Sequence, residues 1–150
     1  MSLRLSDTMR NKLLDGGASG GIKAGLNAGF IAIYSGSQPS SANTGATGTL
    51  LGTVTVNGDG VTGLGFDSAS GGVLSKAAAQ AWKFTGLAAG IAGWYRLYAP
   101  GDTITATDPT KPRVDGAIGT SGAELNLSNI SIAISQVNTV DAFTITMPAA

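Results

Sequence analysis

Short stretches in which apolar residues recur with a period of two occur along most of this chain, and they limit the fold to one built from β-strands. In the stretch "TVTVNGDG", Val54 and Val56 face one side, threonines face the other, and Asn57-Gly58 follows as a turn signal. The sequence therefore predicts an all-β fold. The number and spacing of the segments favour a jelly-roll-like antiparallel β-sandwich of about eight strands.

The N-terminal part of the chain has a different period and predicts a helix over residues 2–15. Ser6 is suited to cap this helix, and Gly16-Gly17 ends it. Residues spaced four apart form an apolar stripe, which packs either on the sandwich itself or on a neighbouring molecule. The stripe consists of Leu5, Met9 and Leu13. We therefore expect a helical arm with a Gly-rich linker in residues 1–28 and a sandwich domain in residues 29–150.

The most aromatic segment, "GIAGWYRLYAP", predicts a strand with two different faces. One face carries Ile91, Tyr95 and Leu97. The other face carries Trp94, Arg96 and Tyr98. Aromatic rings beside arginine can bind nucleic acids or sugars, but a single basic residue accompanies these rings. We interpret the second face as partly covered, with its three side chains as core residues or as anchors of a protein interface.

Composition excludes several classes of function. The chain contains no histidine and no cysteine, which excludes Ser/His/Asp and Cys/His catalysis, disulfides and thiolate metal sites. Nine basic and nine acidic residues give a net charge of zero, without the positive footprint of a nucleic-acid-binding protein. No apolar run approaches the ~20 residues that span a bilayer. We expect no enzyme activity, no cofactor, no metal ion, and no direct contact with nucleic acid or a membrane.

Two weaker chemical signals favour structural interpretations. The glycines of "DGAIGTSGAELNLSNISIAIS" are followed by strand-like residues, whereas a phosphate-binding loop needs a helix N-terminus at that point. A glycosidase would need two carboxylates about 5–10 Å apart in a cleft. Most acidic residues stand beside Gly or Pro, and we expect these to cap their own turns. The acidic residues considered are Asp59, Asp67, Asp102, Asp108, Asp115, Glu124 and Asp141.

Several short motifs occur in an order that resembles a known family. They are "IAIYSGSQP", "ATGTLLGTVTV", "AGWYRLY", "VDGAIGTSGAELNLSNISIAI" and "FTITMP", and the match runs over most of residues 1–147. In this order they resemble a family of small virion proteins of tailed bacteriophages. Two segments depart from the family pattern: the glycine-rich "GGASGGIKAGLNAG" and the insertion "PGDTITATDPTKP".

The resemblance implies a capsid cement or decoration protein on the capsid surface of the virion, made in the host bacterial cytoplasm. Its implied partners are the major capsid protein and itself, as a dimer or trimer. A charged fraction of 12% agrees with a surface covered by other protein, because an average domain has roughly 25%. We expect loops 36–48 and 99–113 to contact the capsid. The candidate interface side chains are Leu5, Met9, Leu13, Trp94, Arg96 and Tyr98.

Three alternatives remain open at the level of the sequence. The same sandwich could serve as a tail, neck or baseplate component. A carbohydrate- or receptor-binding module would need exposed aromatic rings on a flat face or in a cleft. A glycan hydrolase would need two carboxylates close together in a groove.

Overall fold

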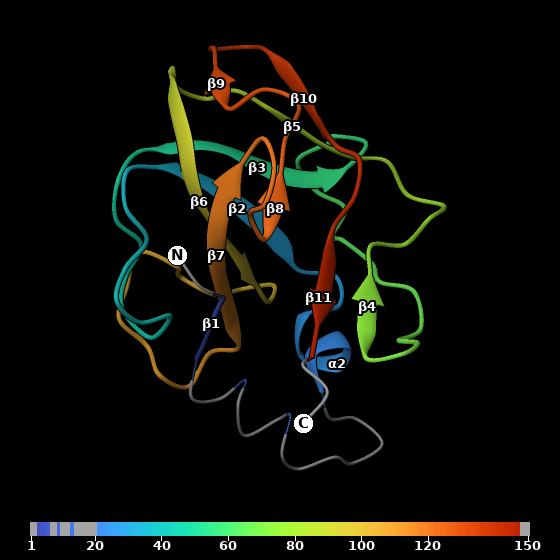
Figure 1. Ribbon diagram of the computed structural model, residues 1–150. Coiled ribbons are helices and arrows are strands. Elements are labelled where there is room, and N and C mark those ends of the chain that lie inside the picture. The colour runs from blue at the N-terminus through green and yellow to red at the C-terminus, as the bar shows by residue number, and fades with distance from the viewer. Residues whose placement is uncertain (1–2, 7–8, 10–12, 14–20, 148–150) are drawn as a thin grey trace.

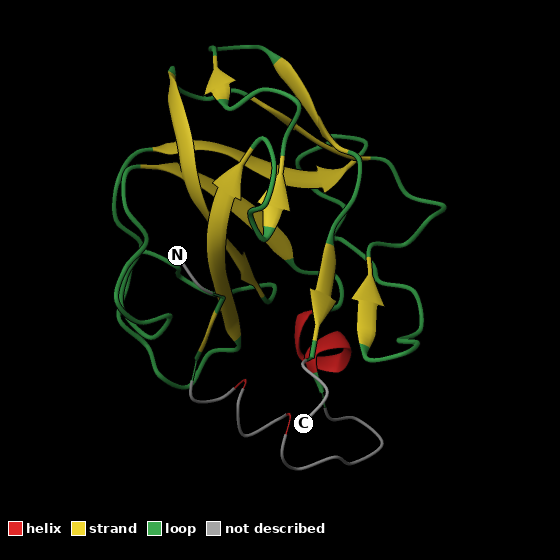
Figure 2. Ribbon diagram, in the orientation of Figure 1, coloured by secondary structure: helices red, strands yellow, loops and turns green. Residues whose placement is uncertain are grey.

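The computed structural model describes residues 3–6, 9, 13 and 21–147 (Figure 1). Most of this part of the chain is strand and loop, as Figure 2 shows, and α2 (Ile22–Leu26) is a short helix. The strands are β1 (Arg4–Leu5), β2 (Phe30–Ser35), β3 (Leu50–Val56), β4 (Val73–Ser75), β5 (Trp82–Thr85), β6 (Gly90–Tyr98), β7 (Arg113–Gly119), β8 (Leu125–Asn126), β9 (Ser131–Ile132), β10 (Val137–Val140) and β11 (Thr144–Thr146). The predicted all-β sandwich is confirmed.

The strands form a nine-stranded and a two-stranded sheet. The order along the large sheet is β1-β7-β6-β2-β3-β5-β10, with β8 beside β7 and β9 beside one end of β6. All pairs are antiparallel except β7 with β8. The small sheet pairs β11 with β4, near α2, while β9 and β10 lie at the other end of the molecule (Figure 1).

The large sheet carries an apolar cluster on each face. In β2, Ile31 and Ile33 belong to the main core, whereas Ala32 and Tyr34 belong to a small second cluster that also contains Trp94. A period of two along the strand produces this division. The main core closes the sandwich, and the second cluster lies under loops described below.

Phe143 joins the parts of the main core that come from distant segments. Its ring lies 5.8 Å from that of Trp82 in β5, 5.6 Å from that of Tyr95 in β6 and 6.5 Å from that of Phe66. Phe143 itself stands between β10 and β11, so this aromatic group connects the large sheet to the small one. Such contacts add to the free energy already gained by burying large rings.

The predicted faces of β6 are correct for its C-terminal half and wrong for Ile91. Tyr95 lies in the main core and Trp94 in the second cluster, but Ile91 is exposed and Ala92 is buried in its place. The register with β2 shifts by one residue here, which makes Gly93 an extra residue in the strand. A β-bulge of this kind exchanges the two faces of a strand, and local periodicity does not reveal it.

The predicted helix over residues 2–15 is wrong at its start. Arg4 and Leu5 form strand β1, in register with Asp115 and Val114 of β7. The edge of β7 offers backbone groups that need partners, and pairing satisfies them while Leu5 packs against the main core. Tertiary contact therefore overrides local helix preference at these two residues.

The predicted cap at Ser6 is present. The Met9 backbone N–H donates a hydrogen bond to Ser6 Oγ at 3.2 Å, and Met9 and Leu13 are helical. The other residues of the predicted helix after Ser6 lie outside the described part of the chain. Residues Ile22–Leu26, interpreted from the sequence as loop, form α2, which buries Ile22 and Leu26.

The substitution Phe143→Ala is expected to lower the free energy of unfolding by about 3–5 kcal/mol, because it removes a buried ring and leaves a cavity. Urea unfolding followed by tryptophan fluorescence measures this change. The control is Val61→Ala, at a side chain that is 78% exposed, where we expect a change within about 0.5 kcal/mol. Equal effects of the two substitutions would contradict the assignment of Phe143 to the core.

Candidate functional site

Two long connections lie side by side and cover the outer face of the large sheet (Figure 1). Residues 36–49 connect β2 to β3, and residues 99–112 connect β6 to β7. We call them together the two-loop surface. Beneath them lies the second cluster of Ala32, Tyr34 and Trp94, against which both loops pack apolar residues. The loops expected from the sequence to bind a partner are thus adjacent, although they are far apart in the chain.

Arg96 of β6 holds both loops from below. It lies directly opposite Asp115 of β7, and its Nε and Nη2 groups donate two parallel hydrogen bonds of 2.7 Å to the carboxylate. Neither side chain has any exposed surface. The remaining Nη1 group donates to the carbonyl of Thr44 at 2.8 Å and to that of Ile104 at 3.0 Å. One buried guanidinium therefore binds the sheet and one carbonyl from each loop.

Arg113 of β7 repeats this arrangement. Its Nε and Nη2 groups donate hydrogen bonds of 2.7 Å to the carboxylate of Asp102 in the second loop. It also donates to the carbonyls of Thr103 at 3.3 Å and Ala106 at 3.1 Å. Longer contacts of 3.4 Å reach three successive carbonyls in residues 42–44. The planar guanidinium carries five N–H donors in a fixed arrangement, which lets one arginine donate to many acceptors at once.

Backbone contacts complete the junction between the two loops. The Ala46 N–H donates to the carbonyl of Ile104, and the Asp108 N–H donates to that of Asn43, both at 2.8 Å. Gly45 lies so close to the second loop that a Cβ atom there would stand 2.2 Å from the carbonyl oxygen of Thr105. Only glycine allows this approach, and the two loops therefore behave as one unit.

The charges beneath the loops compensate one another. Burial raises the pKa of the Asp115 carboxyl, while the hydrogen bonds and charge of Arg96 oppose that rise. Hydrogen bonding to Asp102 raises the pKa of the Arg113 guanidinium. Two cations face two anions, so the cluster has no net charge. Removing one member would leave a buried charge without its counter-ion, at a cost of about 3–5 kcal/mol.

The structure brings together the three residues predicted on one face of β6. Trp94 stacks on Tyr34 with ring centroids 4.8 Å apart, and the Arg96 guanidinium lies 5.5 Å from the Trp94 ring. Trp94 and Arg96 have no exposed surface, while Tyr98 is partly exposed beside Phe30. Their position supports the loops from beneath, and in this structure Trp94 and Arg96 offer no surface to a partner.

The apolar stripe near the N-terminus packs on the sandwich itself. Met9 is fully buried in the main core, and Leu5 and Leu13 are partly buried against it. Of the two arrangements left open by the sequence, packing on the chain's own core is the one observed.

The carboxylates divide into capping and ion-paired groups. Two cap their own turns as predicted: Asp59 accepts from the N–H groups of residues 61 and 62, and Asp108 from that of residue 110. Asp67 instead accepts from the N–H of Ala78, eleven residues further along the chain. Hydrogen bonds from Thr62 and the backbone lower the pKa of Asp59 to about 2. The capping prediction is wrong for Asp102 and Asp115, which bind buried arginines. The signal missed was register, because Arg96 and Asp115 meet only when β6 pairs with β7.

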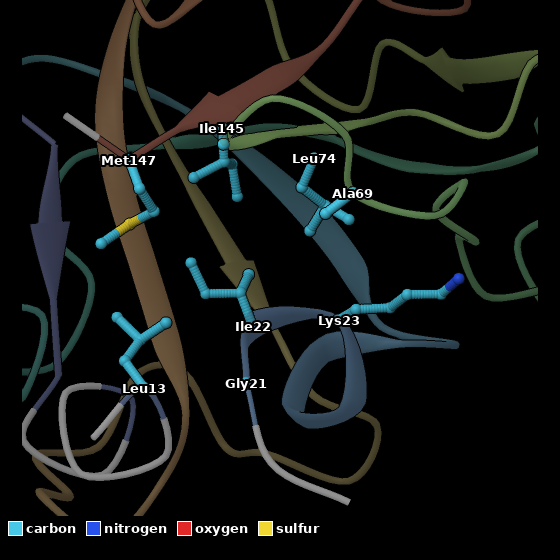
Figure 3. Close-up of a pocket in the computed structure, with 9 residues that line it drawn as sticks. Leu13, Gly21, Ile22, Lys23, Ala69, Leu74, Ile145 and Met147 are labelled. Carbon is cyan, nitrogen blue, oxygen red and sulfur yellow. The ribbon is translucent and has the colours of Figure 1, made fainter. Parts of the chain in front are cut away.

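Two cavities outside the two-loop surface offer different chemistry. Glu124 and Asp141 line a cavity of about 220 Å³, and Glu124 also accepts a hydrogen bond of 2.9 Å from the Ala117 N–H. A second cavity, of about 300 Å³, is almost wholly apolar. Figure 3 shows Ile22, Ile145 and other apolar side chains directed into it, while the Lys23 amine points away. Its lining residues are Leu13, Gly21, Ile22, Lys23, Ala69, Gly72, Leu74, Ile145 and Met147.

The described residues contain neither a metal-binding cluster nor a membrane-spanning helix. Within residues 3–6, 9, 13 and 21–147, no group of three or more His, Cys, Asp or Glu side chains is placed to hold a metal ion. In the same residues, no helix has the length and apolar character needed to cross a membrane. No family model, curated protein or solved structure matches the chain.

The substitution Arg113→Met is expected to destabilise the protein by about 3–5 kcal/mol, because Asp102 would stay buried without its counter-ion. Amide hydrogen exchange should increase most in residues 99–112, under conditions where β2 and β3 stay protected. The control Lys111→Met removes a charge from the same loop without touching the ion pair. Uniform exchange in Arg113→Met across loops and strands would show that the arginine does not hold the loops.

Proposed function

We propose that this chain is a structural protein of a tailed-bacteriophage virion, a cement or decoration protein that binds the outside of the major capsid protein lattice. The observation that carries the proposal is the two-loop surface, a broad surface fixed from beneath by two buried arginines. The motif order that resembles small virion proteins adds support. The two-loop surface would contact the capsid.

The exposed residues of the two loops suit a permanent protein contact. They are small, β-branched or proline, and therefore lose little side-chain entropy when a partner covers them. The exposed side chains include Ser37, Thr47, Pro100, Thr103, Thr105, Thr107, Pro109 and Thr110. These side chains carry no charge, and the charges of Asp108 and Lys111 in the second loop offset one another. The surface therefore gains its affinity mainly from shape and hydrogen bonding, with little dependence on salt.

The proposed mechanism is thermodynamic. A protein that binds the mature lattice and not its alternatives stabilises that lattice by the free energy of binding. A rigid surface serves this purpose because the loops are ordered before they meet the capsid, and little conformational entropy is lost on contact. Many copies on one shell add their contributions, and contacts with several neighbours raise the effective concentration of each.

A tail, neck or baseplate protein would use the same kind of surface, but it would be present in fewer copies per particle. A carbohydrate-binding role gains no support from Trp94, because a ring without exposed surface cannot stack on a sugar. The capsid role is therefore the function we propose first.

Quantitative mass spectrometry of purified virions tests the proposed function directly. We expect a ratio of this chain to the major capsid protein that is near one or another simple fraction of the lattice. A handful of copies per particle would assign the chain to the tail or neck instead. Absence from the particle would overturn a virion role.

The substitution Thr105→Lys is expected to weaken binding to shells that lack this protein by about tenfold or more, because it places a long charged side chain in a neutral contact. Sedimentation of shells with added protein measures the bound fraction. The control is Thr120→Lys, which adds the same charge at an exposed position outside both loops. Equal binding by both variants would exclude the two-loop surface as the contact.

A further inference from the structure

Strand β10 is an edge strand, and its free edge has the features of a pairing site. It ends the order of the large sheet and pairs only with β5 in the described part of the chain. We propose that β10 pairs antiparallel with β10 of a second copy of this chain, so that one continuous sheet crosses a two-fold dimer. This inference concerns a different surface from the two-loop surface and does not depend on the proposed function.

The register with β5 identifies the backbone groups that point outward. The Gly86 N–H donates to the Gln136 carbonyl at 2.8 Å, which marks a hydrogen-bonded pair just before β10. Bonding directions alternate along an antiparallel strand. Asn138 therefore directs its N–H and C=O groups toward β5, while Val137 and Thr139 direct theirs to the free edge. These outward groups are the ones that a second strand would bind.

Within β10 itself, the edge lacks the devices that usually prevent such pairing. Proteins protect edge strands with lysine, proline, bulges or inward charges. Residues 134–140 read "ISQVNTV", with no charged residue and no proline. The register of β10 with β5 is continuous over all four residues, and the irregular part lies just before them, where Ser135 (φ 64°) and Gln136 both bond to Gly86. At the opposite edge of the sheet, β1 is only two residues long. The four-residue edge of β10 is therefore the longer of the two.

Exposed aliphatic side chains lie on the segments near this end of the large sheet. Four of them, on the β5–β6 connection, the start of β6 and the β9–β10 segment, are Leu87 (60% exposed), Ile91 (56%), Ile134 (66%) and Val137 (64%). Hydrogen bonding holds these segments together, because the Ser135 N–H donates to the Gly86 carbonyl at 2.8 Å and Ile91 pairs with Ser131. Figure 1 shows β9 and β10 at the same end of the molecule. An apolar group of this kind gains free energy when a partner covers it.

Symmetry and charge favour a second copy as the partner. An antiparallel pair of identical strands is self-complementary about a two-fold axis. The outward groups match in two registers, one with Thr139 opposite Thr139 and one with Asn138 opposite Asn138. Asp141, the nearest acidic residue in the chain, faces the uncharged Val137 in the first register and Ser135 in the second. With a net charge of zero, two copies also lack overall repulsion.

Sedimentation velocity of the purified full chain over a wide concentration range tests the pairing. We expect a monomer–dimer equilibrium, and we expect Thr139→Lys to weaken it by about tenfold or more because it places a positive charge from each copy at the paired edge. The control Thr105→Lys adds the same charge to the two-loop surface and should leave dimerisation unchanged. Circular dichroism verifies that both variants are folded. A wild-type monomer at all concentrations would overturn the proposal, as would a dimer that Thr139→Lys leaves intact.

Cysteine crosslinking gives a second test that does not rely on weakening the dimer. The natural chain has no cysteine, so a single introduced thiol reports one contact. In the two registers, Thr139→Cys or Asn138→Cys would meet its own copy within disulfide distance. We expect one of them to form a disulfide-linked dimer on mild oxidation, while Thr105→Cys forms no disulfide-linked dimer. Failure of both edge cysteines to crosslink in a solution of dimers would assign dimerisation to another surface. Shell binding by a variant that no longer dimerises would separate this proposal from the proposed function.

Discussion

The ion pair between Arg96 and Asp115 is the interaction on which the outer half of this structure depends. Two charges without exposed surface are tolerable only when their hydrogen-bonding groups are satisfied. Asp115 satisfies one side of the guanidinium, and the carbonyls of Thr44 and Ile104 satisfy the other. Because those carbonyls belong to two different loops, neutralising the buried charge also fixes both loops on the sheet. The same hydrogen bonds that allow these charges to be buried therefore also order the two loops.

The two faces of the large sheet are stabilised by different physical forces. The main core relies on apolar burial, with an aromatic group around Phe143 that connects distant segments. The outer face relies on bidentate arginines and stacked rings beneath the loops. The bulge at Gly93 exchanges the two faces within β6. Beyond the bulge the strand turns Ile91 to solvent, beside the segments that lead to the β10 edge.

The two surfaces proposed for binding lie on different elements of the sandwich. The two-loop surface is formed by connections at one side, and the free edge of β10 lies at the far end of the strand order. The two-loop surface has no net charge and is ordered by the ion pairs beneath it. The β10 edge offers backbone groups that have no partner among the described residues. Under the two proposals, one chain would bind a lattice and a second copy at the same time. That combination suits a protein that strengthens a shell by joining neighbouring positions.

The sequence by itself determined the features that depend on neighbouring residues. Period-two alternation established the strands and most of the two faces of β6, and local chemistry identified the caps at Ser6 and Asp59. Only the tertiary structure decided the strand order, the conversion of Arg4–Leu5 into a strand, and the burial of Asp115. The physical reason is the distance along the chain over which each interaction acts. Alternation and capping act over a few residues, whereas an ion pair between β6 and β7 exists only after long-range pairing sets the register.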